Sequence, residues 1–213
     1  MQDKRFVAMC SGVIAAIVAA AVMAAPSFAS ADVAAGASSD AAQRVRWAAT
    51  PVPLPDFRLT DEHGRAFGLS DLRGRTALLF FGFTNCRNVC PATMQVLKQV
   101  RRSLGEEAVP LVSVFVSVDG TRDTPPVLRE YLEPFSPGFI GLTGEPAEVR
   151  VLADRLSAVF FKGMPTDAQG GYDVEHTSQV YLVDGQGRLR ATFYAAGADT
   201  ISAATQTVLR ETT

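Results

Sequence analysis

The sequence predicts an α/β domain that contains a parallel strand–helix–strand unit, an antiparallel hairpin and a final helix. Two predominantly apolar segments, 76–83 and 111–118, have the composition of strands that are buried on both faces of a sheet. The segment between them, 91–104, carries apolar residues at helical spacing, as the crossover between two parallel strands requires. Residues 179–194 contain two short apolar runs around a Gly-containing turn, which predicts the hairpin.

Composition and charge are those of one globular domain. The chain has 213 residues, of which 47% are hydrophobic and 20% are charged, enough to build a full core. The formal net charge is −2 and no basic run is present, so we expect no nucleic-acid partner. Cysteine is scarce: there are three, and Cys10 lies apart from the other two.

The N-terminus has the layout of a secretory signal. Lys4 and Arg5 precede an uncharged stretch, residues 6–25, and small residues suited to cleavage follow. We expect residues 1–31 to be a signal peptide or, as the alternative, an uncleaved inner-membrane anchor, because about twenty apolar residues can span a bilayer. Both interpretations place the domain in the periplasm or on the outer face of the inner membrane.

The folded domain is expected to begin after a linker. Residues 32–50 are rich in Ala, Ser, Gln and Arg, which predicts a flexible linker, and residues 51–213 are expected to form the domain. Two short runs between Phe57 and Phe67 flank a turn that ends at Gly64, which predicts an N-terminal β-hairpin.

Turn signals and periodicity define the remaining elements. Gly105 ends the helix that starts at Pro91. A second helix is capped at Thr124 and broken by Pro134, and a third opens at Pro146, with apolar spacing that continues to Phe160. The other predicted segments are a short strand at 139–142, a polar, Gly-rich loop at 161–171, a further loop at 172–178, the strand 179–183, its hairpin partner 188–194 and a helix at 200–210.

This order of elements is that of thioredoxin. A parallel βαβ crossover followed by an antiparallel hairpin and a helix is the thioredoxin arrangement, and the N-terminal hairpin and the inserted helix match its larger relatives. We therefore expect a thioredoxin-like α/β fold with an N-terminal β-hairpin extension and an inserted helix.

A cysteine pair lies where the first central strand passes into its helix. Cys86 and Cys90 precede Pro91, a residue suited to the first turn of a helix. The dipole and free N–H groups of a helix N-terminus favour a negative charge, and a thiolate is such a charge. The pair is therefore expected to be reactive or metal-binding. In an oxidising compartment it would tend to form a disulfide unless it is reduced or ligated.

The predicted topology brings a histidine to these cysteines. The first central strand ends beside the loop that precedes the hairpin, and that loop contains His176. Two thiolates and an imidazole lack the fourth protein ligand of structural zinc, whereas sulfur favours Cu(I) and imidazole also suits Cu(II). We expect copper, as Cu(I), Cu(II) or both, on Cys86, Cys90 and His176. Glu175 and Asp119 are the candidates for orienting the ring.

Plainer interpretations stay open for each of these residues. The cysteines alone could form a structural disulfide or a metal-free redox dithiol. His63 lies in the hairpin turn, and Met94 has the spacing of a core residue. Met164, in a predicted loop, could be a soft outer contact. The residues 119–123 could be only a helix cap with an ion pair.

The sequence resembles the Sco/SenC family of copper chaperones for cytochrome c oxidase assembly. The matching stretches are Phe80-Phe81-Gly82-Phe83-Thr84 with Cys86, Cys90 and Pro91; Ser117-Val118-Asp119 with Arg122-Asp123-Thr124-Pro125; Phe139-Ile140-Gly141-Leu142-Thr143-Gly144; and Glu175-His176-Thr177. The resemblance implies that Cys86, Cys90 and His176 bind copper. It also implies delivery of copper to the copper A centre of the oxidase, or reduction of the cysteines of that centre.

The chain departs from the family pattern around the cysteines. Asn85, Arg87 and Asn88 replace the usual His, Pro and Asp, and Gly120 replaces a usual proline. The loop is therefore more positive, from which we expect lower thiol pKa values and a weaker preference for Cu(II).

Two functions from different classes follow. The first is a metallochaperone whose partners are the copper-bearing subunit of the oxidase or another copper chaperone, and a thiol–disulfide reductant. The second is an enzyme, a periplasmic thiol–disulfide oxidoreductase acting through Cys86 and Cys90. A copper-sensing or scavenging module is a third interpretation.

Overall fold

The computed structural model describes residues 44–165 and 171–212. Its main sheet has eight strands in the order β1-β10-β9-β4-β5-β6-β2-β3, and a separate two-stranded sheet pairs β7 with β8. The strands are β1 Val45–Pro53, β2 Arg58–Asp61, β3 Ala66–Gly68, β4 Thr76–Gly82, β5 Leu111–Ser117, β6 Phe139–Thr143, β7 Phe160–Pro165, β8 Tyr172–His176, β9 Val180–Val183 and β10 Arg188–Phe193. The helices are α3 Val89–Leu104, α4 Pro125–Leu132, α5 Pro146–Arg155 and α6 Ala198–Thr212, with short 3-10 turns η1 Leu69–Leu72, η2 Gly105–Ala108 and η3 Glu133–Phe135.

The centre of the sheet is the predicted βαβ unit. β4 and β5 are parallel, from the pair Thr76 and Leu111 to the pair Gly82 and Ser117, and every residue of both strands is buried. β9 and β10 continue the sheet in antiparallel sense. The predicted thioredoxin-like order of strands is therefore confirmed.

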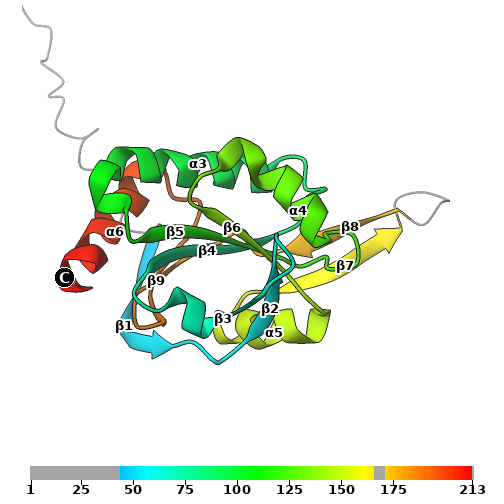
Figure 1. Cartoon of the computed structure of the whole chain (residues 1–213), viewed down its shortest axis with the longest axis horizontal. Coiled ribbons are helices and arrows are strands. Elements are labelled where there is room, and N and C mark those ends of the chain that lie inside the picture. The colour runs from blue at the N-terminus through cyan, green and yellow to red at the C-terminus, as the bar shows by residue number, and fades with distance from the viewer. Residues whose placement is uncertain (1–43, 166–170, 213) are drawn as a thin grey trace, which may run out of the picture. The chain divides into compact units, whose positions relative to one another are not determined.

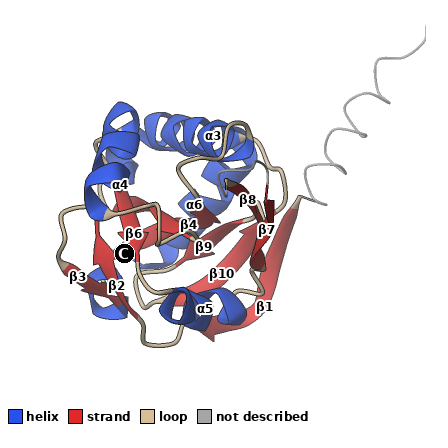
Figure 2. Ribbon diagram, turned by 90° about the vertical axis from the view of Figure 1, so that its right-hand side faces the viewer, coloured by secondary structure: helices blue, strands red, loops and turns tan. Residues whose placement is uncertain are grey.

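Helices cover both faces of the sheet (Figures 1 and 2). The cluster of buried residues on one face draws on α3, α4 and α6, and the cluster on the other face draws on α5. The predicted apolar stripe of α3 is fully or nearly fully buried: Met94, Leu97, Val100 and Leu104. These layers hold the carboxyl end of β4 and the start of α3 in a fixed relation.

The N-terminal boundary of the fold differs from the prediction. β1 pairs antiparallel with β10, so the fold includes Val45 to Thr50, for which the composition predicts a linker. Most residues of this edge strand are exposed, and they therefore lack the apolar alternation that reveals a strand in sequence. The predicted signal peptide or anchor, and residues 32–43 of the linker, lie outside the described residues.

The predicted N-terminal hairpin is present as β2 and β3. β2 also pairs with β6, which joins the hairpin to the far edge of the main sheet. Within the residues that the structure describes, no helix is both long enough and apolar enough to cross a bilayer.

The prediction of a helix that continues to Phe160, followed by loops up to residue 178, is wrong. The third predicted helix, α5, stops at Arg155, and Ser157 follows in the left-handed region with φ 54°. The chain then enters β7, which pairs with β8 in a hairpin that extends away from the main sheet (Figure 1). Phe160 is buried, as predicted, but from a strand rather than a helix. His176 is therefore at the end of a strand, not in a loop.

Candidate metal centre

The cysteines lie at the junction of β4 and α3. Cys86 is in the turn, and Cys90 is in the first turn of α3, which begins at Val89, two residues before Pro91. The backbone N–H of Cys90 donates to Cys86 Sγ over 3.4 Å. Cys90 is fully buried and Cys86 is partly exposed, and both are free thiols. One sulfur therefore faces solvent while the other lies behind it.

The hairpin of β7 and β8 places His176 on these sulfurs. Its Nε2 lies 3.6 Å from Cys90 Sγ, although the residues are 86 positions apart. One ligand atom from each of Cys86, Cys90 and His176 lies within 4.8 Å of the others, and among the described residues no other group of three His, Cys, Asp or Glu side chains meets that condition. The imidazole also packs edge-on against Phe83, with ring centroids 5.7 Å apart.

The second ring nitrogen of His176 is held by the backbone. Nδ1 lies 3.0 Å from the carbonyl oxygen of Thr177. A carbonyl oxygen only accepts, so this bond requires the proton on Nδ1 and leaves the Nε2 lone pair directed toward Cys90. The acceptor that orients the ring is therefore this carbonyl, and neither Glu175 nor Asp119 has that role. Such a bond on the remote nitrogen is the usual support of a metal-binding histidine.

The electrostatics of Cys90 differ from our expectation. Burial raises the pKa of the Cys90 thiol well above its ordinary value, and a hydrogen bond from the Phe83 backbone only partly offsets this effect. The nearby Cys86 and Asp123 raise this pKa further. The expectation of a lowered thiol pKa is therefore wrong for Cys90, because desolvation outweighs the helix N-terminus. Without a bound cation, Cys90 is a protonated thiol at neutral pH.

A surface cavity of about 600 Å³ opens onto the site. Residues 85–89 of the cysteine turn line one side, and residues 173–176 of β8 line the other. Cys86 and His176 face this cavity, whereas Cys90 is behind them. A ligand atom of another molecule can therefore reach the exposed sulfur and the imidazole first.

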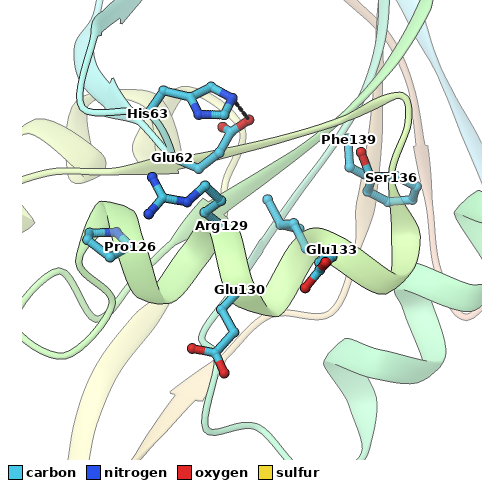
Figure 3. Close-up of a pocket in the computed structure, with 9 residues that line it drawn as sticks. Glu62, His63, Pro126, Arg129, Glu130, Glu133, Ser136 and Phe139 are labelled. Atoms are coloured by element: carbon cyan, nitrogen blue, oxygen red, sulfur yellow. Dashed lines mark ion pairs between the residues drawn. The ribbon is translucent and has the colours of Figure 1, made fainter.

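Other sequence candidates lie elsewhere. His63 lines a different cavity, of about 520 Å³, where its Nε2 lies 3.4 Å from a Glu62 oxygen (Figure 3). Met94 is buried on α3, as predicted, and 84% of the surface of Met164 on β7 is exposed. Gly82, the last residue of β4, was missed as a site residue: a Cβ on it would lie 2.6 Å from Cys90 Sγ. Its place in the strand before the cysteines was the only available signal.

Comparison with known proteins decides the family. The SCO1/SenC family model matches residues 49–210. The chain belongs to the SCO1/SenC family. A SCO2-like protein of Rickettsia felis is 34% identical over 139 residues, which cover 65% of this chain and 68% of that protein.

Solved structures agree with this assignment. The structure of Bradyrhizobium japonicum ScoI with copper bound is 33% identical, with a TM-score of 0.66, over 75% of this chain and 99% of that one. The crystal structure of yeast Sco1 with copper bound is 30% identical, with a TM-score of 0.62, over 74% of this chain and 87% of that one.

In this SCO1/SenC protein, three of the four departures from the family pattern line the cavity. Asn85, Arg87 and Asn88 all contribute to its wall, so they change the surface that an approaching molecule meets. Gly120 lies elsewhere, where an added Cβ would come within 2.2 Å of the Gly144 carbonyl oxygen. That close approach explains why glycine suits this position.

Proposed function

We propose that this protein binds copper through Cys86, Cys90 and His176 and transfers it to a partner during the assembly of cytochrome c oxidase. The observation that carries the proposal is the meeting of the three ligand atoms within 4.8 Å, with the His176 Nε2 lone pair directed at the Cys90 sulfur. Membership of the SCO1/SenC family and the copper-bound structures of its relatives support it.

The donor set fits copper better than zinc. Two sulfurs and one imidazole match the soft or borderline preference of copper. Within residues 44–165 and 171–212, no further Cys, His, Asp or Glu completes the group to the four protein ligands of structural zinc. The open side of the site, at Cys86, suits a metal that is cargo rather than a permanent part of the fold.

Binding and release follow from the unequal exposure of the ligands. The thiol protons are released to solvent when the sulfurs bind copper. The positive charge of the metal then offsets the free-energy cost of holding the Cys90 thiolate in a buried place. Partner thiolates that enter the cavity displace the exposed Cys86 and His176 before the buried Cys90. Oxidation of Cys86 and Cys90 to a disulfide, with two electrons passed to an acceptor disulfide, removes both sulfur ligands and stops binding.

A copper titration of the reduced protein tests the ligand set. We expect one copper per chain, and His176→Ala and Cys86→Ala should each weaken binding by at least about tenfold. His63→Ala is the matched control, because His63 is the only other histidine in the chain and lies in a different cavity. Unchanged affinity in both ligand variants would refute the proposal.

The exposed–buried arrangement of the cysteines also favours a second function. Cys86 is partly exposed and has Cys90 directly behind it, as an attacking and a resolving thiol require. A thiol–disulfide reductase would reduce a disulfide substrate, such as oxidised cysteines of the oxidase, without bound metal. Turnover of a model disulfide that survives His176→Ala would favour this enzyme over the metallochaperone.

Partners and location follow from the same proposal. The copper-bearing subunit of cytochrome c oxidase or another copper chaperone would exchange the metal, and a thiol–disulfide reductant would keep the cysteines reduced. The predicted signal or anchor at residues 1–31 supports export to the periplasm or to the outer face of the inner membrane.

A further inference from the structure

The loop between β5 and α4, residues 118–124, contacts both the cysteine segment and the histidine hairpin. We propose that this loop is the positioning element that sets the separation between His176 and the cysteines, and that Arg122 and Tyr172 form the contact that holds the hairpin. The inference rests on the proposed copper function for the role of His176 as a ligand, and on the contacts of this loop for its physical basis.

On the cysteine side, the loop holds the residues that leave β4. Asp123 is fully buried, and its carboxylate accepts hydrogen bonds from the Thr84 N–H at 3.0 Å and from the Thr84 hydroxyl at 2.6 Å. The Ser117 hydroxyl also donates to it, at 2.6 Å. Thr84 is two residues before Cys86, so these bonds fix the direction in which the chain leaves the sheet.

On the histidine side, the same loop holds the first residue of β8. The Tyr172 hydroxyl donates to Asp119 Oδ1 at 2.7 Å, and the Tyr172 carbonyl accepts from Arg122 Nη1 at 2.9 Å. The Arg122 guanidinium carbon lies 3.8 Å from the centroid of the Tyr172 ring, and Arg122 Nε donates to Asp119. One loop therefore contacts the hydroxyl, the carbonyl and the ring of a single tyrosine.

The helix-cap interpretation does not account for these contacts. Thr124, the N-cap of α4, makes no side-chain capping bond. The carboxylate of Asp123 is directed to Thr84 and Ser117, and that of Asp119 to Tyr172 and Arg122, rather than to the N-terminus of α4. The predicted ion pair is present, but both of its members are engaged with the hairpin.

The hairpin depends on such contacts because it stands apart from the main sheet. β7 and β8 pair only with each other, so side-chain and loop contacts, rather than a strand ladder, fix their orientation. Phe160 and Val174 are buried in the core cluster that includes α5. Arg150 of α5 holds the end near Phe160 by donating to its carbonyl, at 3.1 Å. The Tyr172 contact holds the other end, about 13 Å along the strand from His176 at the usual rise per residue.

Tyr172 and His176 are four positions apart on β8, so their side chains share one face of the strand. Arg122 also lies over Phe83, 5.9 Å from its ring centroid, and Phe83 packs against His176. A change at Arg122 therefore reaches the imidazole by two routes, the strand and the Phe83 ring.

The test replaces the bridging contacts without removing a copper ligand. Arg122→Lys keeps the charge but loses the planar fork and the stacking surface, and Tyr172→Phe removes only the bond to Asp119. Both should weaken copper binding about tenfold, the usual effect of losing a contact that supports a ligand. Lys162→Ala is the control: its Nζ lies 3.7 Å from the Tyr172 ring centroid, but it belongs to the hairpin itself and bridges nothing.

A double variant separates positioning from general stability. If Arg122 acts through His176, Arg122→Lys combined with His176→Ala should bind copper no more weakly than His176→Ala alone. Additive losses, or an affinity in Arg122→Lys equal to that of Lys162→Ala, would overturn the inference.

Amide hydrogen exchange in the metal-free protein gives a readout that does not depend on copper. Arg122→Lys and Tyr172→Phe should increase exchange in β7 and β8 while α3 and β5 stay protected. Unchanged exchange in the hairpin would overturn the inference even if copper binds as proposed. If exchange is faster in these variants but the unsubstituted protein binds no copper, the result would count against the proposed function and would leave the positioning role of the loop standing.

Discussion

Replacing Gly82 by alanine would place a methyl group against the sulfur of Cys90. The new Cβ would lie 2.6 Å from Cys90 Sγ, 2.8 Å from the Phe115 ring and 3.2 Å from the Phe80 ring. Carbon and sulfur atoms do not approach this closely, so the sulfur and the rings must shift within a strand that is buried on both faces.

The expected loss of stability is moderate. Overpacking of this kind costs about 1–3 kcal/mol, and the lower entropy of the unfolded alanine chain offsets about 0.4–1 kcal/mol of it. The middle of each range gives an expected net destabilisation of about 1.3 kcal/mol. Copper affinity should fall as well as stability, because one of the displaced atoms, Cys90 Sγ, is a proposed ligand.

Urea denaturation of the reduced, metal-free protein and a copper titration measure these two effects. Gly197→Ala is the control for copper affinity, since a Cβ at Gly197 would meet no atom within 4 Å and should leave that affinity unchanged. Gly197 directly precedes α6 and its carbonyl accepts from the Ile201 N–H, so its alanine variant should lose only the small stability of a helix cap. If Gly82→Ala resembled Gly197→Ala in stability and in copper affinity, the inferred close approach of β4 to Cys90 would be wrong.

Two further predictions concern the fold. Asp184 pairs with Arg188 and Arg190, and although its burial raises the pKa, the hydrogen bonds from Arg188 and from the Gln186 backbone hold it below its ordinary value of 3.8. The stability it contributes is therefore complete above the unfolded-state pKa and is lost as the pH falls through the folded-state pKa. Asp184→Asn should unfold at a lower urea concentration at pH 7, and its free energy of unfolding should fall less between pH 7 and pH 3 than that of the unsubstituted protein. The same pH dependence in both proteins would contradict this role of the Asp184 carboxylate. Leu97→Ala, in the fully buried stripe of α3, should cost about 2–5 kcal/mol in the same assay, and a loss below 1 kcal/mol would contradict the packing of α3 on the sheet.

The sequence by itself determined the centre of this protein. β4 and β5 follow from their predominantly apolar composition and α3 from its helical spacing, which are local properties of a chain that must bury those residues. The cysteines and His176 could be nominated as partners, because in a thioredoxin-like order the end of β4 and the segment before β9 are neighbours.

Only the tertiary structure decided how those residues meet. β1 and the hairpin of β7 and β8 exist because of their pairing partners, and their largely exposed residues carry little apolar pattern. The bond from His176 to the Thr177 carbonyl and the raised pKa of Cys90 depend on atoms brought together by folding. The contacts of residues 118–124 with the cysteine segment and with the histidine hairpin could not be predicted from the sequence either. Hydrogen bonds between residues 39 to 53 positions apart leave no local periodicity.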